Sequence, residues 1–343
     1  MINEPIILGI ESSCDDTSAA VLKGQKILSN IIAGQDVHKK YGGVVPELAS
    51  RAHQQNIIPV IDQAIKKAGI DKSDISAIAI TRGPGLLGSL LVGTSFTKGF
   101  SLGRDIPMLE VDHLQAHILA HFVDMGQDMP VFPFLCLTVS GGHTQIVKVT
   151  DYFQMEIIGN TIDDAAGEAF DKTAKILGLP YPGGPHIDRL AKIGDENKFG
   201  FPFPKIQGLN FSFSGIKTSF LYFVRDGLKK NDNFIEENQA DLAASMQKLI
   251  VDILIGKLKR ASKETGIKQI AIAGGVSANS GLRDAIKAGE KAFGWETYIP
   301  EFQFTTDNAA MIAIAGYFKF LKKEFLPIDF VPYARALHKT KKH

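Results

Sequence analysis

The order of secondary-structure elements repeats within this sequence, and that repeat constrains the fold more than any single motif. The segment Ile6–Glu11 is apolar and β-branched, as expected of a buried strand. Apolar residues recur every three to five positions in Pro46–Ala68, which predicts a helix that starts at a proline. The first series is predicted as strands at 6–11, 17–22 and 26–34, a helix at 46–68, a strand at 75–81, a helix at 88–102 and a strand at 107–111.

A second series follows in a similar order, but it is larger. Its predicted elements are strands at 132–140, 144–149 and 153–159, a helix at 163–177, a strand at 268–273, a helix at 277–292, a strand at 296–299 and a helix at 305–320. A Gly/Pro-rich insert at 179–204 and helices at about 212–229 and 234–264 enlarge it. The duplication lies in the order of elements, because no residue-level repeat is visible. Strands and helices mixed in this way predict an α/β fold with two mixed sheets.

The chain of 343 residues is long enough for two domains with cores of their own. We expect an N-terminal lobe of residues 1–111 with roughly 320–343. We expect a C-terminal lobe of residues 112–319, with a helical insert at about 179–265. Two such lobes are predicted to leave a cleft between them, where ligands tend to bind.

Charge and cysteine content narrow the class of protein. The 38 Lys and Arg residues nearly balance the 37 Asp and Glu residues, so a nucleic-acid partner would need a local basic patch. The candidates are Lys217 and a basic C-terminal run of Arg335, His338, Lys339, Lys341, Lys342 and His343. With only Cys14 and Cys136, no disulfide framework is expected. The absence of a signal peptide pattern and of an apolar run approaching ~20 residues predicts a cytoplasmic protein without a membrane partner.

Two histidines four residues apart, His113 and His117, are the clearest sign of a metal site. On a helix, both imidazoles leave the same face and can bind one ion. Metalloproteases with the H-E-x-x-H motif carry a Glu directly after the first His, whereas this chain has Leu114. Asp307 is the candidate third ligand, with a simple helix-start carboxylate as the alternative. Two His and one carboxylate suit Fe(II), with Zn(II) as the alternative, and His121 is interpreted as a surface or outer residue.

Three loops rich in small residues are predicted to face a nucleotide. They lie at Gly9–Thr17, at 139–144 (V-S-G-G-H-T) and at 273–279 (A-G-G-V-S-A-N). Glycine lets backbone amides approach phosphate closely, and a helix N-terminus favours anions. The alternative for each loop is a plain tight turn.

Two further motifs are weaker. Asp164, Glu168 and Asp171 recur at spacings of four and three beside a Gly-Gly turn, so they could bind ribose hydroxyls or merely favour a helix start. The run 83–88 (G-P-G-L-L-G) matches the dinucleotide-binding fingerprint. We disfavour that interpretation, because three strands precede it and no second half of a Rossmann sheet follows.

Taken together, the motifs resemble those of the TsaD family, the universal tRNA threonylcarbamoyladenosine transferases. The resemblance rests on 9–17 (G-I-E-S-S-C-D-D-T), His113–His117, 139–144, 163–171, 181–185, 273–279, 82–90 and 210–218 (N-F-S-F-S-G-I-K-T). It implies an ASKHA (actin/Hsp70/sugar-kinase-like) α/β fold, with two duplicated RNase H-like βββαβα lobes and a nucleotide cleft between them.

The resemblance also implies a reaction. Such an enzyme transfers the threonylcarbamoyl group from threonylcarbamoyl-AMP to the N6 amine of the adenosine 3′-adjacent to the anticodon (position 37), in tRNAs that read codons starting with A. The metal, usually iron, would be held by His113, His117 and Asp307. The adenine nucleotide would lie against Thr138, Val139, Ser140, Gly141, Gly142, Asp171, Gly184, Asp188 and Asn279. The implied partners are tRNA, a TsaB paralogue, the ATPase TsaE and a separate synthase that makes threonylcarbamoyl-AMP.

Glu11 ends the first strand and could take a proton from the attacking amine or place a water, or it could only support its loop. The main alternative function is a metal-dependent glycoprotease, which Leu114 opposes. A non-enzymatic nucleotide-binding partner should lack the histidine pair. A sugar kinase of the same fold would need a catalytic Asp at a sugar site.

Overall fold

The central strand of the first sheet carries apolar side chains on both faces. In the computed structural model, which describes residues 4–335, β1 (Ile6–Glu11) pairs antiparallel with β2 (Thr17–Lys23) and parallel with β4 (Ala77–Gly83). The sheet order is β3-β2-β1-β4-β5, completed by β3 (Lys26–Ala33) and β5 (Met108–Asp112). Helices cover both faces of this sheet, so its central strand is buried on both faces, which explains the continuous apolar run of β1.

Helices cover the two faces of this sheet. Leu8 and Ile10 pack with Ile57 and Ile61 of α1 (Pro46–Ala68), beside α2 (Leu87–Arg104). Successive side chains of a strand point to opposite faces, so Gly9 faces the other way. There α9 (Ala309–Leu321) lies so close that a Cβ on Gly9 would meet Ala309 O at 2.4 Å.

The second sheet is built in the same way. β6 (Phe134–Val139) pairs antiparallel with β7 (Thr144–Asp151) and parallel with β9 (Gln269–Ala273). Its order is β10-β9-β6-β7-β8, with β8 (Gln154–Asn160) and β10 (Glu296–Tyr298) at its edges. Read from the other side, this order matches that of the first sheet strand for strand. The predicted duplication of element order and the two mixed sheets are therefore confirmed.

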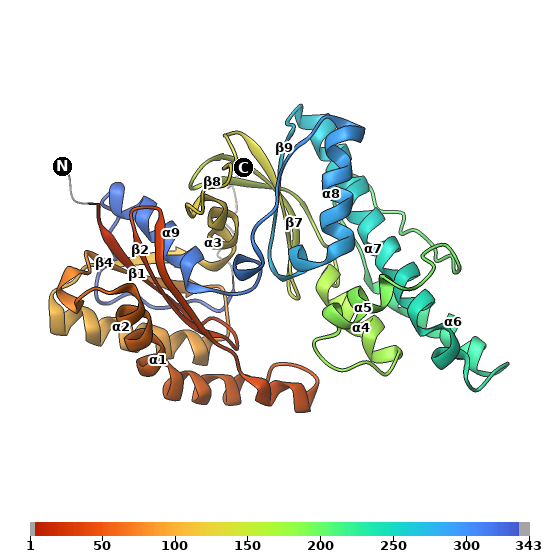
Figure 1. Cartoon of the computed structure of the whole chain (residues 1–343), viewed down its shortest axis with the longest axis horizontal. Coiled ribbons are helices and arrows are strands. Elements are labelled where there is room, and N and C mark those ends of the chain that lie inside the picture. The colour runs from red at the N-terminus through yellow and green to blue at the C-terminus, as the bar shows by residue number, and fades with distance from the viewer. Residues whose placement is uncertain (1–3, 336–343) are drawn as a thin grey trace, which may run out of the picture. The chain divides into compact units, whose positions relative to one another are not determined.

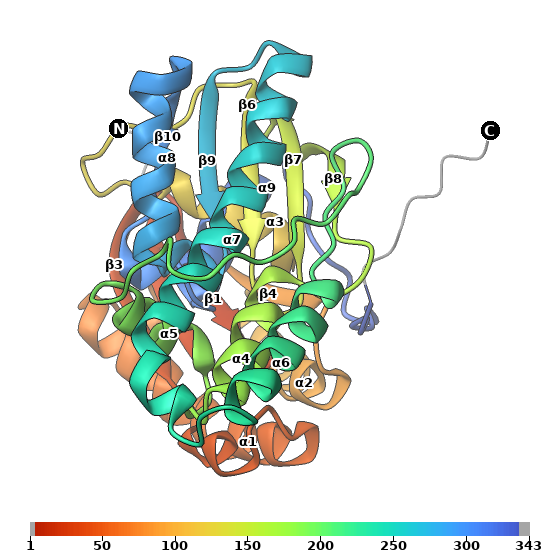
Figure 2. The same cartoon turned by 90° about the vertical axis from the view of Figure 1, so that its right-hand side faces the viewer.

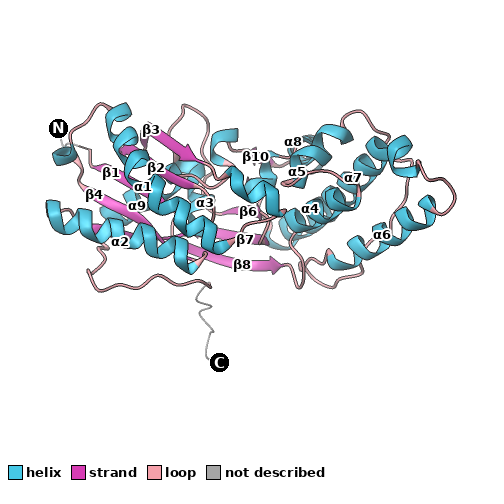
Figure 3. Ribbon diagram, turned by 90° about the horizontal axis from the view of Figure 1, so that it is seen from below, coloured by secondary structure: helices cyan, strands magenta, loops and turns pink. Residues whose placement is uncertain are grey.

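Five helices accompany the second sheet: α4 (Ala166–Ile176), α5 (Gly183–Ala191), α6 (Ser214–Leu228), α7 (Phe234–Thr265) and α8 (Ser280–Phe293). The long helix α7 shares one apolar core with β6 and β9 (Figure 2). The chain divides into one unit of Met1–Met129 with Thr306–His343 and another of Pro130–Thr305 (Figure 1). Figure 3 shows the strands of each unit with their flanking helices.

The observed units differ from the expected lobes in two segments. Residues 112–129 and 306–319 belong to the first unit, because α3 (His113–Leu119) packs on α9 and α9 packs on β1, β2 and β4. Helix α5 lies in the Gly/Pro-rich insert, where no helix was predicted. Cys14 and Cys136 are free thiols. Within residues 4–335, no helix is both long and apolar enough to span a bilayer.

Candidate functional site

A short helix brings the histidine pair together. Strand β5 ends at Asp112, whose Oδ1 accepts hydrogen bonds from Leu114 N and Gln115 N, both at 3.0 Å, and so caps α3. His113 and His117 lie one turn apart on α3, with ring centroids 4.8 Å apart. The prediction that both imidazoles share one helix face is confirmed.

Asp307 lies against both rings. Its Oδ1 is 3.1 Å from His117 Nε2 and 3.4 Å from His113 Nε2. One ligand atom from each of the three side chains lies within 4.8 Å of the others. Asn308 caps α9 by accepting from Met311 N, so Asp307 does not serve as that helix's cap. The three predicted ligands thus come together within the first unit.

Glu11 lies behind His113 and is fully buried. Its Oε2 accepts from Thr81 Oγ1 at 2.7 Å and lies 3.1 Å from His113 Nδ1, and its Oε1 accepts from Ser13 N. Ser13 Oγ is also 3.1 Å from His113 Nδ1. An Nδ1–H that donates to a carboxylate leaves the lone pair on Nε2, on the side of Asp307. Ser13 and Thr81 were missed at the sequence level, although Ser13 lies in a small-residue loop singled out there.

The electrostatics of this cluster suit a cation. Burial lowers the pKa of His113, but Asp307 and Glu11 outweigh burial and raise it well above its ordinary value. Burial raises the pKa of Asp307 and of Glu11, yet the neighbouring His113 holds both below their ordinary values. Two carboxylates therefore stay ionised around the histidines. A divalent cation could replace the proton on His113, because metal ligands must be deprotonated.

The donor set fits a metal such as iron or zinc. Two imidazole nitrogens and one carboxylate oxygen converge, and a second carboxylate supports one ring from behind. Within the described residues, His117 Nδ1 is buried without a hydrogen-bond partner. His121 is also buried, in the 3₁₀ turn Ala120–Phe122 after α3, so the surface interpretation of it was wrong.

In the second unit, the predicted loop residues lie at the ends of β6 and β9. Thr138 and Val139 are buried in β6, whereas Gly141 and Gly142 are exposed with open space beside them. A Cβ on Gly274 would meet Val139 O at 2.5 Å, so the two glycine loops lie side by side. The hairpin therefore presents backbone atoms, and not large side chains, at this edge of the sheet.

The polar residues expected near the nucleotide each hold a neighbouring segment in place. Asp171 Oδ1 accepts from Gly183 N at 2.7 Å, directly before Gly184, and burial raises the pKa of Asp171. Asp188 Oδ1 accepts from the backbone N and the hydroxyl of Ser280. Asn279 caps α8 through Leu282 N and donates to Gln247 Oε1 at 2.6 Å. These contacts join α4, α5, α7 and α8 around the Gly-Gly turns.

The structure also bears on two weaker motifs from the sequence, the acidic residues at 164–171 and the glycine motif at 83–88. Asp164 and Glu168 both pair with Lys172, at 2.5 and 2.8 Å, whereas Asp171 accepts from Gly183 N, so the ribose-binding role of the three acids stays a prediction. In the 83–88 motif, a Cβ on Gly83 would meet Tyr333 O at 2.1 Å, and one on Gly85 would meet Ser13 O at 2.5 Å. These glycines are packed against the protein's own backbone, which supports the rejection of a dinucleotide site there.

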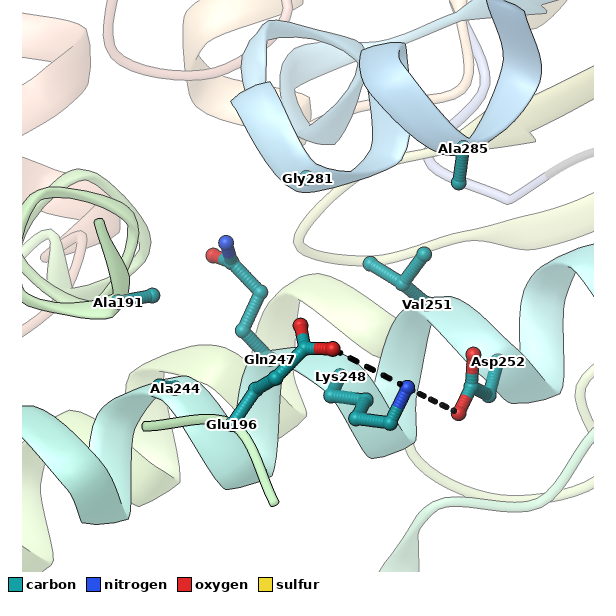
Figure 4. A pocket seen from close by; sticks show the side chains of 9 residues that line it. All are labelled: Ala191, Glu196, Ala244, Gln247, Lys248, Val251, Asp252, Gly281 and Ala285. Carbon is teal, nitrogen blue, oxygen red and sulfur yellow. Dashed lines mark ion pairs between the residues drawn. The ribbon is translucent and has the colours of Figure 1, made fainter. Parts of the chain in front are cut away.

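A pocket of about 210 Å³ opens between α7 and α8 (Figure 4). Small side chains line it beside Gln247, the partner of Asn279. Lys248 crosses one side, with its Nζ 3.4 Å from Glu196 and 3.6 Å from Asp252. The lining thus combines small apolar side chains with one amide and three charged groups.

Comparisons with known proteins agree with this picture. The family model described as TsaD, tRNA N6-adenosine threonylcarbamoyltransferase, matches residues 26–314. A protein of that name from Christiangramia forsetii is 66% identical over 97% of this chain and 98% of its own, and one from Porphyromonas gingivalis is 62% identical over 98% and 99%.

Solved structures share the fold at low identity. HypF from T. kodakarensis aligns with a TM-score of 0.62 at 15% identity, over 94% of this chain and 48% of its own. The activator of the 2-hydroxyisocaproyl-CoA dehydratase from Clostridium difficile, with bound ADPNP, aligns with a TM-score of 0.50 at 16% identity, over 95% and 100%. These likenesses show the ASKHA fold alone, since one fold serves many functions.

Proposed function

The chain belongs to the TsaD family of tRNA N6-adenosine threonylcarbamoyltransferases, and from this premise we propose how its residues serve the reaction. The enzyme transfers a threonylcarbamoyl group from threonylcarbamoyl-AMP to the N6 amine of the adenosine beside the anticodon, and AMP leaves. The transfer needs a polarised carbonyl, a held leaving group and a correctly oriented amine.

We propose that His113, His117 and Asp307 hold one divalent metal, Fe(II) with Zn(II) as the alternative. The support is the convergence of their ligand atoms within 4.8 Å, together with the carboxylate of Glu11 behind His113. Such a metal would act as a Lewis acid toward the carbonyl and the threonyl oxygens. The residue beside the histidine pair argues against a glycoprotease, because Leu114 stands where that class carries its base.

For Glu11 we propose a positioning role. Both of its oxygens already take part in hydrogen bonds, and the side chain is fully buried. It would keep the Nδ1 side of His113 protonated and the Nε2 side free for the metal. The expected role as a general base or as a water-positioning residue remains a prediction, which the Glu11→Gln variant tests through the pH profile of transfer.

We further propose that the adenylate binds the second unit. The amides of Gly141 and Gly142 would hold the phosphate, because both glycines are exposed with open space beside them, whereas Ser140 N already donates to His143 O. Asp171, Gly184 and Asp188 would lie near the ribose, and Asn279 near the base. The pocket beside Gln247, the partner of Asn279, would accept the adenine ring.

The acceptor is a tRNA, as the family implies. We propose that a TsaB paralogue, the ATPase TsaE and a separate threonylcarbamoyl-AMP synthase complete the pathway in the cell. Lys217, exposed in the first turn of α6, is a candidate tRNA contact. Of the basic C-terminal run, Arg335 is exposed, and the others lie outside the described residues.

Reconstitution tests this proposal. Purified protein, threonylcarbamoyl-AMP, tRNA and the partner proteins are combined, and the nucleosides are analysed by mass. We expect threonylcarbamoyladenosine with wild type and none with His117→Ala, while the circular dichroism of the variant stays unchanged. Full modification by His117→Ala would refute the metal assignment. Metal-dependent cleavage of a glycoprotein by the wild type would favour the alternative function.

A further inference from the structure

The last described segment of the chain, residues 326–335, returns to the first unit and is here called the C-terminal strap. Leu326 N donates to Met108 O at 2.8 Å, at the start of β5. Farther along, Tyr333 N donates to Arg82 O at 3.0 Å, and Gly85 N donates to Ala334 O at 3.2 Å. The strap is therefore bound by backbone hydrogen bonds to β5 and to the end of β4.

Near its end, the C-terminal strap contacts Asp112, the residue that caps α3. Tyr333 OH donates to Asp112 Oδ2 at 3.0 Å, while Asp112 Oδ1 accepts from the first amides of α3. The backbone at Tyr333 reaches this place only because Gly83 has no side chain, since a Cβ there would meet Tyr333 O at 2.1 Å. Arg82 also covers the ring, 5.9 Å from its centroid, and donates to Val331 O. The phenol is thereby fixed on one oxygen of Asp112.

Helix α3, which Asp112 caps, is too short to be stable without contacts to the rest of the protein. Helix α3 has 7 residues, and isolated helices of that length are unstable in water. Its orientation therefore depends on its contacts with neighbouring elements, chiefly α9, and on its cap. His113 directly follows Asp112, and His117 lies one turn farther along, so a change in the cap would move both rings relative to Asp307.

We propose that Tyr333 is a positioning residue for the metal centre and acts through Asp112 and α3. Its hydroxyl fixes the carboxylate of Asp112 in the orientation that caps α3, and the cap sets the distance of both imidazoles from Asp307. This inference rests on the proposed role of His113 and His117 as metal ligands.

The test measures metal binding directly. Metal-free protein is titrated with Co²⁺, and the visible absorption of the bound ion gives the dissociation constant and the ligand geometry. Outer partners of metal ligands typically contribute 10–100-fold to affinity. Because Tyr333 acts one contact farther out, we expect Tyr333→Phe to weaken Co²⁺ binding about tenfold and to change the absorption band. Tyr317→Phe removes the same hydroxyl from a half-buried tyrosine of α9 and should match wild type.

A second variant isolates the contact. In Asp112→Ser, serine can still cap α3 but is too short to reach the Tyr333 hydroxyl. Adding Tyr333→Phe to Asp112→Ser should therefore weaken Co²⁺ binding no further. Fully additive losses would overturn the proposed route through Asp112.

The remaining outcomes distinguish a failure of this inference from a failure of the proposed metal site. If Tyr333→Phe lowers the melting temperature of the metal-free protein but leaves the Co²⁺ dissociation constant unchanged, the strap is only structural and the inference fails. If His117→Ala also binds Co²⁺ as wild type does, the metal site itself is refuted. If His117→Ala loses Co²⁺ binding and Tyr333→Phe does not, the positioning role of Tyr333 is refuted and the metal site is supported.

Discussion

Gly167, in the first turn of α4, lets the hairpin loop proposed to hold phosphate rest on the helix. Its N–H donates to Ser140 O at 3.2 Å, and the position is buried. A Cβ there would lie 2.5 Å from Ser140 O and 2.8 Å from Gly141 Cα. Ordinary contacts begin near 3.4 Å, so the Gly167→Ala variant must move the loop or the helix by roughly 1 Å.

The energetic cost of that movement can be compared with the stability that alanine adds to the helix. Overpacking a rigid site costs about 1–3 kcal/mol. Stretching the Gly167–Ser140 hydrogen bond costs about 1 kcal/mol more. The better helix propensity of alanine returns at most ~1 kcal/mol, and less in a first turn. The net loss is therefore about 1–3 kcal/mol. At ~2–4 °C per kcal/mol for a unit of this size, the melting temperature should fall by roughly 2–12 °C.

The chain has its own probe for this measurement. Trp295 is the single tryptophan and is buried in the second unit, where its Nε1 donates to Ser262 Oγ. Its fluorescence on heating reports the unfolding of that unit. Gly256→Ala in α7 is the matched control, because a Cβ there meets nothing within 4 Å. The control should be more stable than wild type by about 0.5–1 kcal/mol.

The same pair of variants tests the proposed phosphate loop. In calorimetric titration with AMP, Gly167→Ala should bind more weakly than wild type, because the amides around Gly141 have moved, whereas Gly256→Ala should bind equally. A Gly167→Ala protein as stable as Gly256→Ala would refute the steric argument. A destabilised protein with unchanged AMP affinity would refute the role of the loop in binding.

Three further outcomes are expected. Burial and the neighbouring acids raise the pKa of Asp16 from 3.8 to about 7. Between those two pH values the unfolded chain ionises while the folded side chain stays protonated, so this group's contribution to stability falls as pH rises. In thermal melts of metal-free protein, the stability of Asp16→Asn relative to wild type should increase from pH 4 to 7 and stay constant above pH 7. A difference in stability that does not change with pH would contradict this. Asp163 accepts four hydrogen bonds from Ser212, Phe213 and Ser214 at the start of α6, so Asp163→Ala should lose about 1–2 kcal/mol and speed hydrogen exchange there; unchanged exchange would exclude this role. Zn²⁺ at about 100 times its dissociation constant should stabilise wild type by about 2.7 kcal/mol and leave His117→Ala unaffected; equal stabilisation of both would place the ion elsewhere.

Local sequence determined the elements and their order. Hydrophobic periodicity is a property of neighbouring residues, so Ile6–Glu11, Pro46–Ala68 and most other elements could be located from the sequence, some with bounds shifted by a few residues. The spacing of His113 and His117 likewise needs only one helical turn to bring the rings together. The order of elements then predicted two mixed sheets of like topology, which the structure confirms.

Tertiary contacts decided what local sequence could not. The Pro-Gly-Gly-Pro run before His186 is typical of a turn, yet it begins α5, because Asp171 from another helix accepts from Gly183 N. Helix α4 starts at Ala166 instead of 163, since Asp163 is held by the start of α6. Such contacts join residues far apart in sequence, so no local pattern predicts them.

The metal centre shows the same division most clearly. The sequence by itself determined the histidine pair and the absence of a protease base beside it. It suggested Asp307 only as a candidate, and it left Glu11 between two roles. Folding brings Asp307 across 190 positions to His117, and Glu11 across 102 positions to His113. The direction in which a carboxylate points depends on how α3, α9 and β1 pack, and only the folded chain sets that packing.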